Sequence, residues 1–173
     1  MKVVVIGGTG HIGTYLIPRL VNAGHEVICV SRSQRDPYKT DPAWNAVQQV
    51  NIDRAAAEGK NSFGSQIKAL HGDVVIDLIC FTPESAAQLA EALTGTVQHF
   101  IHCGTMWVHG HSEQVPTTET QPRKPFGEYG INKANIEAYL LSLHRENNFP
   151  VTILHPGHIT GPGWHPINPA GHL

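Results

Sequence analysis

Tyr129 and Lys133 are four residues apart, a spacing that places both side chains on one face of a helix. A phenol has a pKa near ~10, which is too high for a base at neutral pH. A neighbouring ammonium group stabilises the phenolate and lowers that pKa. The spacing therefore predicts a proton-transferring Tyr129 whose pKa is lowered by Lys133. An amphipathic helix with an exposed lysine would show the same spacing by chance.

Thr105 adds a hydroxyl group to this pair. It follows the apolar run Val97 to Cys103, which is typical of a strand. Its side chain would then stand at the carboxyl edge of the sheet and orient a substrate oxygen beside Tyr129. We predict a catalytic set of Thr105, Tyr129 and Lys133.

A glycine-rich segment near the N-terminus lies between a strand pattern and a helix pattern. Glycine permits the tight turn, clears the backbone for a pyrophosphate and lets the helix pack closely on the strand. The helix N-terminus then offers free N–H groups to the phosphates. In this context the segment predicts dinucleotide binding, rather than a tight turn without a ligand. The segment reads Gly7-Gly8-Thr9-Gly10-His11-Ile12-Gly13.

The type of dinucleotide is indicated by the end of the second expected strand. A carboxylate that binds the ribose hydroxyls is expected about twenty residues after the glycines, and it is missing. Arg32 stands there instead and can bind a 2′-phosphate, which favours NADP over NAD. The alternative is an arginine on a solvated loop edge.

Further residues at expected strand ends complete the predicted cofactor site. Asp53 is placed either to accept from the adenine amino group or to cap the next helix. Lys133 would also bind the cofactor ribose. Phe81, Pro156 and His158 follow strand ends and are assigned to the same site.

Short apolar runs alternate with helical patterns along the chain. The alternation predicts an α/β fold with a doubly wound parallel sheet (Rossmann) in the order 3-2-1-4-5-6. Ligands bind such a sheet at the carboxyl ends of its strands. The expected strands cover residues 2–6, 26–31, 47–52, 73–81, 97–103 and 151–154. The longest helix is expected over 128–147, with Ile131, Ala134, Ala138 and Leu141 as its apolar stripe.

Composition limits the remaining function classes. The chain has 173 residues, 40% of them hydrophobic, and a net charge of −2, which fits one globular domain and offers no basic surface for nucleic acid. Its apolar runs are too short for a membrane span, and no signal peptide is seen. The cysteines Cys29, Cys80 and Cys103 form no disulfide framework. We therefore expect a cytoplasmic protein.

Histidine is frequent, with twelve residues, and two close pairs invite a metal interpretation. His109 and His111 form one pair, and His155 and His158 form the other. Neither has a cysteine or a carboxylate at a fitting distance, so we predict no metal site. We expect His109 and His158 to line the active cleft, and either His99 or His102 to be a hydrogen-bonded core residue.

Together these motifs resemble an extended short-chain dehydrogenase/reductase of the NAD-dependent epimerase/dehydratase kind. The resemblance rests on the glycine segment, on Thr105, and on Tyr129 with Lys133. It rests also on the segments 123–130, Arg-Lys-Pro-Phe-Gly-Glu-Tyr-Gly, and 155–163, His-Pro-Gly-His-Ile-Thr-Gly-Pro-Gly. Two positions depart from the family pattern: Thr105 stands where serine is usual, and His155 where arginine is common.

The resemblance implies an NAD(P)-dependent oxidoreductase that acts on a sugar or nucleotide sugar, with hydride leaving and returning to one substrate. It implies a homodimer contact through the helix that begins at Glu128. The family's C-terminal substrate domain is absent, so residues 1–173 would be the NAD(P)-binding domain, inactive alone. The alternatives are an NADP-dependent carbonyl reductase and a non-enzymatic dinucleotide sensor; RNA binding would need a basic stripe.

Overall fold

Six parallel strands form one sheet in the order β3-β2-β1-β4-β5-β6. The computed structural model describes residues 1–32, 36–112 and 115–163. The predicted doubly wound sheet and its strand order are confirmed. The strands are β1 (Lys2–Ile6), β2 (Glu26–Ser31), β3 (Gln48–Asn51), β4 (Val74–Asp77), β5 (His99–Cys103) and β6 (Val151–Leu154).

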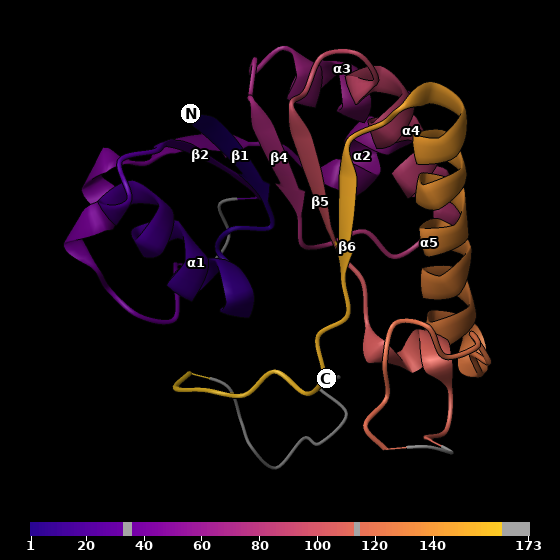
Figure 1. Ribbon diagram of the computed structural model, residues 1–173. Helices are drawn as coiled ribbons and strands as arrows, with labels where there is room; N and C mark the ends of the chain where they lie inside the picture. The colour runs from indigo at the N-terminus through magenta and orange to yellow at the C-terminus, as the bar shows by residue number, and fades with distance from the viewer. Residues whose placement is uncertain (33–35, 113–114, 164–173) are drawn as a thin grey trace.

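Helices cover both faces of this sheet (Figure 1). One face is covered by α1 and a short 3₁₀ helix, and the other by α2 to α5. The α-helices are α1 (His11–Asn22), α2 (Arg54–Glu58), α3 (Phe63–Lys68), α4 (Pro83–Leu93) and α5 (Gly127–Asn147), and the 3₁₀ helices are η1 (Pro42–Ala46) and η2 (Met106–His109).

The core is divided by β1, which is buried on both faces as its β-branched run predicts. Val4 and Ile6 pack into the larger cluster, below α2 to α5. Val3 and Val5 pack into the smaller cluster, below α1. The strand that carries the glycine turn is therefore held from both sides, and the turn projects from a rigid support.

Local sequence signals set the start of α4. The Thr82 side chain accepts a hydrogen bond from the Ser85 N–H, and Pro83 occupies the first helical position. Both features match the expected helix start. The carboxyl end of β4 therefore leads directly into a helix whose first turn borders the site.

The predicted apolar stripe on α5 is wrong. Ile131 and Leu141 are exposed, whereas the buried face is made of Gly130, Lys133, Ile136, Glu137 and Leu140. The error has a physical cause: two charged residues turn inward because they find hydrogen-bond partners there. A pattern that counts apolar residues alone cannot identify such a face.

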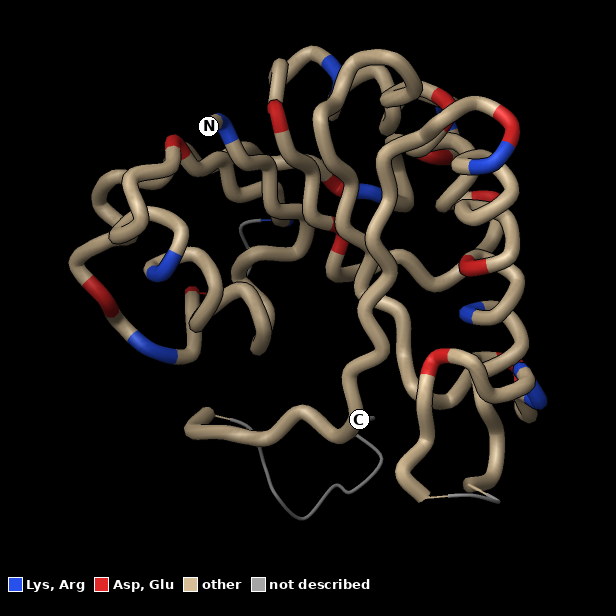
Figure 2. The backbone as a smooth tube through the Cα atoms, viewed as in Figure 1, with Lys and Arg blue, Asp and Glu red and all other residues tan. Residues whose placement is uncertain are grey.

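Charged residues are dispersed over the fold. Figure 2 shows Lys and Arg interspersed with Asp and Glu, with no continuous basic stripe along the described chain. In the same part of the chain, no helix has the length and apolar character needed to cross a bilayer. Cys29 and Cys80 are buried, Cys103 is half-buried, and all three are free thiols.

Candidate active site

The glycine turn joins β1 to α1, and its backbone is closely packed against neighbouring atoms. Gly7 has a φ of +83°, which side-chain-bearing residues rarely adopt. A Cβ atom at Gly13 would lie 2.1 Å from the Gly8 carbonyl oxygen, so glycine is required for close packing of the helix on the turn. At Gly10 a Cβ would meet only the Gly7 carbonyl oxygen, at 3.1 Å. The outer surface of Gly10 is therefore open, as a backbone that receives a phosphate requires.

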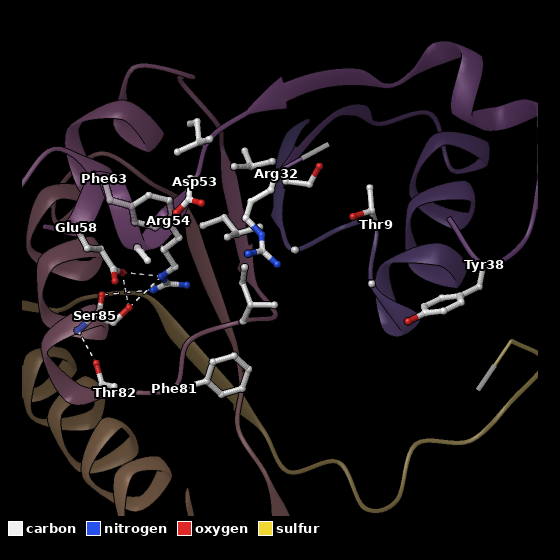
Figure 3. A pocket seen from close by; sticks show the side chains of 18 residues that line it. Thr9, Arg32, Tyr38, Asp53, Arg54, Glu58, Phe63, Phe81, Thr82 and Ser85 are labelled. Atoms are coloured by element: carbon white, nitrogen blue, oxygen red, sulfur yellow. Dashed lines mark hydrogen bonds and ion pairs between the residues drawn. The ribbon is translucent and has the colours of Figure 1, made fainter. Parts of the chain in front are cut away.

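A cleft of about 590 Å³ opens beside this turn at the carboxyl ends of the strands (Figure 3). It is lined by 18 residues, most of which come from the glycine turn, the ends of β1 to β4, and helices α2 and α4, with Tyr38 from the loop after β2 and Phe63 from α3. The predicted residues Gly7, Thr9, Gly10, Arg32, Asp53 and Phe81 are among them. The cleft thus lies where the strand order reverses, the position at which doubly wound sheets bind ligands.

Arg32 is exposed and its guanidinium reaches the cleft, as Figure 3 shows. Asp53 lines the same cleft while its Oδ1 atom caps α2 by accepting from the Ala56 N–H at 3.0 Å. The capping alternative for Asp53 is therefore confirmed. Because a carboxylate has two oxygens, capping leaves Oδ2 available for the cleft.

Other predicted cofactor residues lie outside the cleft lining. Gly8 and Gly13 are buried beneath the turn, and His11 makes edge-on ring contacts with Tyr15 and Tyr38. Their assignment to the cofactor site stays a prediction. The same holds for Ile12 and Pro156, which are half-buried, and for His158, which is exposed.

Thr105, Tyr129 and Lys133 come together at the carboxyl edge of β5. The Thr105 side chain lies near enough to the Tyr129 phenol to lower its pKa, and the Lys133 Nζ atom lies 5.9 Å from the centroid of the Tyr129 ring. The Trp107 ring stands edge-on to Tyr129, with 6.3 Å between centroids. The expected convergence of the three side chains is thus seen in the structure.

The expected lowering of the Tyr129 pKa by Lys133 is wrong for this structure. Burial raises the pKa of Tyr129, and the Thr105 side chain offsets this only in part. Lys133 is not among the main causes of this shift, and its ammonium group donates to the carbonyl oxygens of Cys80 and Cys103, both at 2.8 Å. Those contacts hold Nζ against two backbone carbonyls, and Lys133 is only 2% exposed.

A buried ion-pair network borders the cleft and was missed in the sequence. Arg54 donates to both carboxylate oxygens of Asp77, at 2.8 and 3.0 Å, and to Glu58 at 2.6 Å. Ser85 donates to Glu58 and accepts from the Arg54 Nε atom at 2.9 Å. The local signal was the four-residue spacing of Arg54 and Glu58 on α2, whereas Asp77 and Ser85 lie on other elements.

Asp77, Cys80 and His102 also approach each other, with one potential ligand atom of each within 4.8 Å of the others. Asp77 is already paired with Arg54, and the Lys133 ammonium lies close enough to lower the pKa of His102. The positive charges of Arg54 and Lys133 beside the cluster therefore oppose the binding of a metal cation. His102 is buried as expected for one of the two histidines, but within the described chain neither of its ring nitrogens has a hydrogen-bond partner.

His155 forms a second polar network. Its Nε2 atom contacts Glu137 Oε2 at 2.7 Å, and its Nδ1 atom contacts His109 Nε2 at 3.3 Å. Arg123 donates to the other Glu137 oxygen, at 2.9 Å from Nε. His109, expected in the cleft, is instead buried in this network. The network fixes the segment before Tyr129 against α5.

The family model described as "NAD dependent epimerase/dehydratase family" matches residues 3–173. The chain belongs to the NAD dependent epimerase/dehydratase family. The match covers every element described above, from β1 to the segment that follows β6.

Individual members of the family show the same relationship. The chain is 28% identical over 137 residues to 2'-dehydrokanamycin reductase of Streptomyces kanamyceticus, covering 79% of this chain and 37% of that protein. It is 26% identical over 152 residues to UDP-glucose 4-epimerase of Streptomyces lividans, covering 79% and 45%. The chain thus spans less than half the length of these two relatives.

A solved structure of the family superposes closely. The UDP-glucose 4-epimerase of Thermotoga maritima, determined with UDP-glucose, has a TM-score of 0.78 and 25% identity. The match covers 96% of this chain and 58% of that one.

Proposed function

We propose that residues 1–173 form the dinucleotide-binding domain of an epimerase or reductase that uses NADP, with NAD as the alternative. The observation that carries the proposal is the cleft between the open backbone at Gly10 and the guanidinium of Arg32. The first can receive a pyrophosphate, and the second a 2′-phosphate. The end of β2, where NAD-binding sheets place a carboxylate, has Ser31 and Arg32 instead.

The chemistry assigned to the site follows from Thr105 and Tyr129. A bound nicotinamide would supply hydride transfer. Tyr129 moves the proton of a substrate hydroxyl, and Thr105, which lies beside the phenol, holds the same oxygen. Lys133 positions the end of β5 through its bond to the Cys103 carbonyl and presents a positive charge beneath the Tyr129 ring.

A sugar or nucleotide sugar is the proposed substrate, supported by the names of the relatives, which include UDP-glucose epimerases and a reductase of an aminoglycoside. Turnover is assigned to the whole protein, since the chain spans only part of those relatives. The exposed Ile131 and Leu141 on α5 are in keeping with a homodimer contact through that helix.

Two calorimetric titrations test the cofactor proposal. NADP should bind the protein more tightly than NAD, with one site per chain. Binding of NAD in preference to NADP would overturn the role of Arg32, and binding of neither would overturn the dinucleotide site itself.

A non-enzymatic dinucleotide sensor is the rival function. A sensor needs the glycine turn but not the hydroxyl pair of Thr105 and Tyr129, and that pair is present here. Steady consumption of NADPH with a carbonyl substrate, assayed on the whole protein, would favour a reductase. A substrate converted without net loss of the cofactor would favour an epimerase.

A further inference from the structure

Arg54 is a charged residue of the cleft to which neither the resemblance nor the catalytic set gives a role. It opens α2 directly after Asp53 and lines the cleft, although its side chain is only 10% exposed. Figure 3 shows its guanidinium at the edge of the open cleft, with Glu58 and Ser85 behind it and Arg32 across from it.

The guanidinium is held rigidly. Asp77 binds the Nη1 atom through both carboxylate oxygens, and Glu58 and Ser85 bind Nε. The guanidinium stacks over the Phe63 ring, with 4.8 Å between the Arg54 Cζ atom and the ring centroid. The rotamer entropy of Arg54 is therefore lost on folding, and a ligand that contacts this group does not have to order it.

The Nη2 atom keeps a hydrogen-bond donor to spare. A guanidinium carries five N–H groups, two of them on Nη2. Within the part of the chain that the structure describes, the single acceptor for Nη2 is the Ser85 carbonyl, at 3.4 Å. A purely structural arginine would be satisfied by Asp77 and Glu58 through Nη1 and Nε. The second N–H of Nη2 is left for the cleft.

Asp53 supplies a complementary acceptor beside this donor. Its Oδ1 atom caps α2, and Oδ2 remains for the cleft. Consecutive residues thus present one acceptor and one donor to the same space. Adenine offers the matching pair on one edge, because its exocyclic amino group donates and a neighbouring ring nitrogen accepts. A base with a carbonyl at that position offers an acceptor to the Asp53 carboxylate and is disfavoured.

We propose that Arg54 is a specificity-determining residue that donates from Nη2 to a ring nitrogen of the adenine base, next to the contact of Asp53 with the amino group. The proposal rests on dinucleotide binding in this cleft. It extends the site from phosphate recognition to base recognition and gives the Arg54–Asp77 pair a role in fixing the donor.

The test uses NADP analogues whose adenine is replaced by 1-deaza-, 3-deaza- or 7-deazaadenine, titrated by calorimetry against the unaltered protein. Each analogue keeps the amino group for Asp53 and loses one ring nitrogen. Either the 1-deaza or the 7-deaza analogue should bind roughly 5- to 100-fold more weakly than NADP, the usual range for one directed base contact, whereas the 3-deaza analogue lacks a nitrogen remote from the amino group and should bind as NADP does. A hypoxanthine analogue should also bind more weakly than NADP, because its carbonyl replaces the amino group that Asp53 contacts.

Variants assign the effect to Arg54. Arg54→Lys keeps the positive charge beside Asp77 but lacks the planar fork, so the sensitive analogue should bind as well as NADP does. Arg32→Ala is the matched control: it should weaken NADP and all the analogues equally and keep their ratios. If Arg54→Lys fails to fold, the analogue series on the unaltered protein still tests base recognition, and Arg54→Gln, which keeps hydrogen-bonding groups beside Asp77 but shortens the side chain, takes the place of the lysine variant.

The outcomes separate the two proposals. If all three deaza analogues bind the unaltered protein as tightly as NADP, base recognition by Arg54 is overturned, while the dinucleotide site stands. If NADP and NAD both fail to bind, the two proposals fall together. If one analogue is weakened and Arg54→Lys keeps the same penalty, another residue contacts that ring nitrogen and the role of Arg54 is overturned.

Discussion

The Lys133 Nζ atom donates a 2.8 Å hydrogen bond to the carbonyl oxygen of Cys103, and thereby joins the middle of α5 to the last residue of β5. The same ammonium group donates to the Cys80 carbonyl beyond β4, also at 2.8 Å. One buried side chain therefore connects the ends of two neighbouring strands to the helix that carries Tyr129. This lysine has a structural role besides any contact with a cofactor.

Replacing this lysine should destabilise the fold. Lys133→Met leaves two buried carbonyl oxygens without their donor, which costs about 1–3 kcal/mol for each unsatisfied group. We expect a lower free energy of unfolding in a urea titration monitored by circular dichroism, together with weaker NADP binding. Lys68→Met, at an exposed position on α3, is the control and should change little. Equal stability of the two variants would contradict the role given to the Lys133 contacts.

Two glycines of the turn should respond differently to valine. At Gly10 the nearest atom to an added Cβ is 3.1 Å away, so Gly10→Val should fold and lose dinucleotide binding, because the side chain occupies the place of the pyrophosphate. At Gly13 the corresponding distance is 2.1 Å, to backbone, so Gly13→Val should fail to fold. Thermal denaturation and NADP calorimetry distinguish the two. Unchanged NADP affinity in Gly10→Val would remove the phosphate assignment.

Arg32 should discriminate between the two dinucleotides. Arg32→Ala is expected to weaken NADP binding by ~1.5–3 kcal/mol, the value of a charge-assisted contact, and to leave NAD nearly unaffected. Arg19→Ala, at an exposed position on α1, serves as the charge-matched control. An equal loss for NADP and NAD would show that Arg32 does not read the 2′-phosphate.

His102 should make the protein sensitive to acid. Burial, assisted by the charge of Lys133, lowers the pKa of His102 from 6.5 to about 4. Between these values the unfolded chain binds a proton that the folded protein does not, so stability falls as the pH drops from 6.5 toward 4.

His102→Leu should reduce this loss by roughly 1–3 kcal/mol, since each unit of pKa shift is worth about 1.4 kcal/mol. The free energy of unfolding, measured at pH 7 and at pH 4.5, provides the test, with exposed His111→Leu as the control. If His102→Leu and the unaltered protein lose the same stability between those pH values, His102 is not the group responsible.

Tyr129 should be needed for turnover and not for cofactor binding. In the whole protein, Tyr129→Phe is expected to lower turnover by ~10²–10⁴, the usual contribution of a positioned acid or base. Tyr139→Phe on the same helix removes a phenol that donates to Glu91 at 3.2 Å, and should keep full activity. A comparable loss in both variants would point to damage to α5 rather than to proton transfer.

The sequence allowed the strand order and the glycine turn to be predicted because both depend on local patterns. Gly7 to Gly13 lie between a β-branched run and a helix, and that context alone specifies the turn. The buried face of α5 could not be predicted in this way. Lys133 points inward because it donates to the Cys103 carbonyl, and Glu137 points inward because it binds Arg123 and His155. These partners come from segments that are distant in the sequence.

The same limit explains the errors at the site. The Tyr129 pKa was expected to fall because the spacing brings Lys133 near, but spacing does not reveal that two carbonyl oxygens compete for Nζ. Arg54 was overlooked because its partner Asp77 lies 23 residues away, at the end of strand β4. Pairwise spacing indicates which side chains share a face, whereas the direction of each group depends on the packed fold.

The burial of the three cysteines has a practical consequence for labelling. Desolvation raises the pKa of Cys29 to about 11 and that of Cys80 to about 12, and it raises the pKa of Cys103 as well. Because the thiolate is the form that reacts, all three should resist alkylating reagents near neutral pH. A cysteine introduced at the exposed position Ser112 would therefore take up a maleimide dye selectively, without removal of the native thiols.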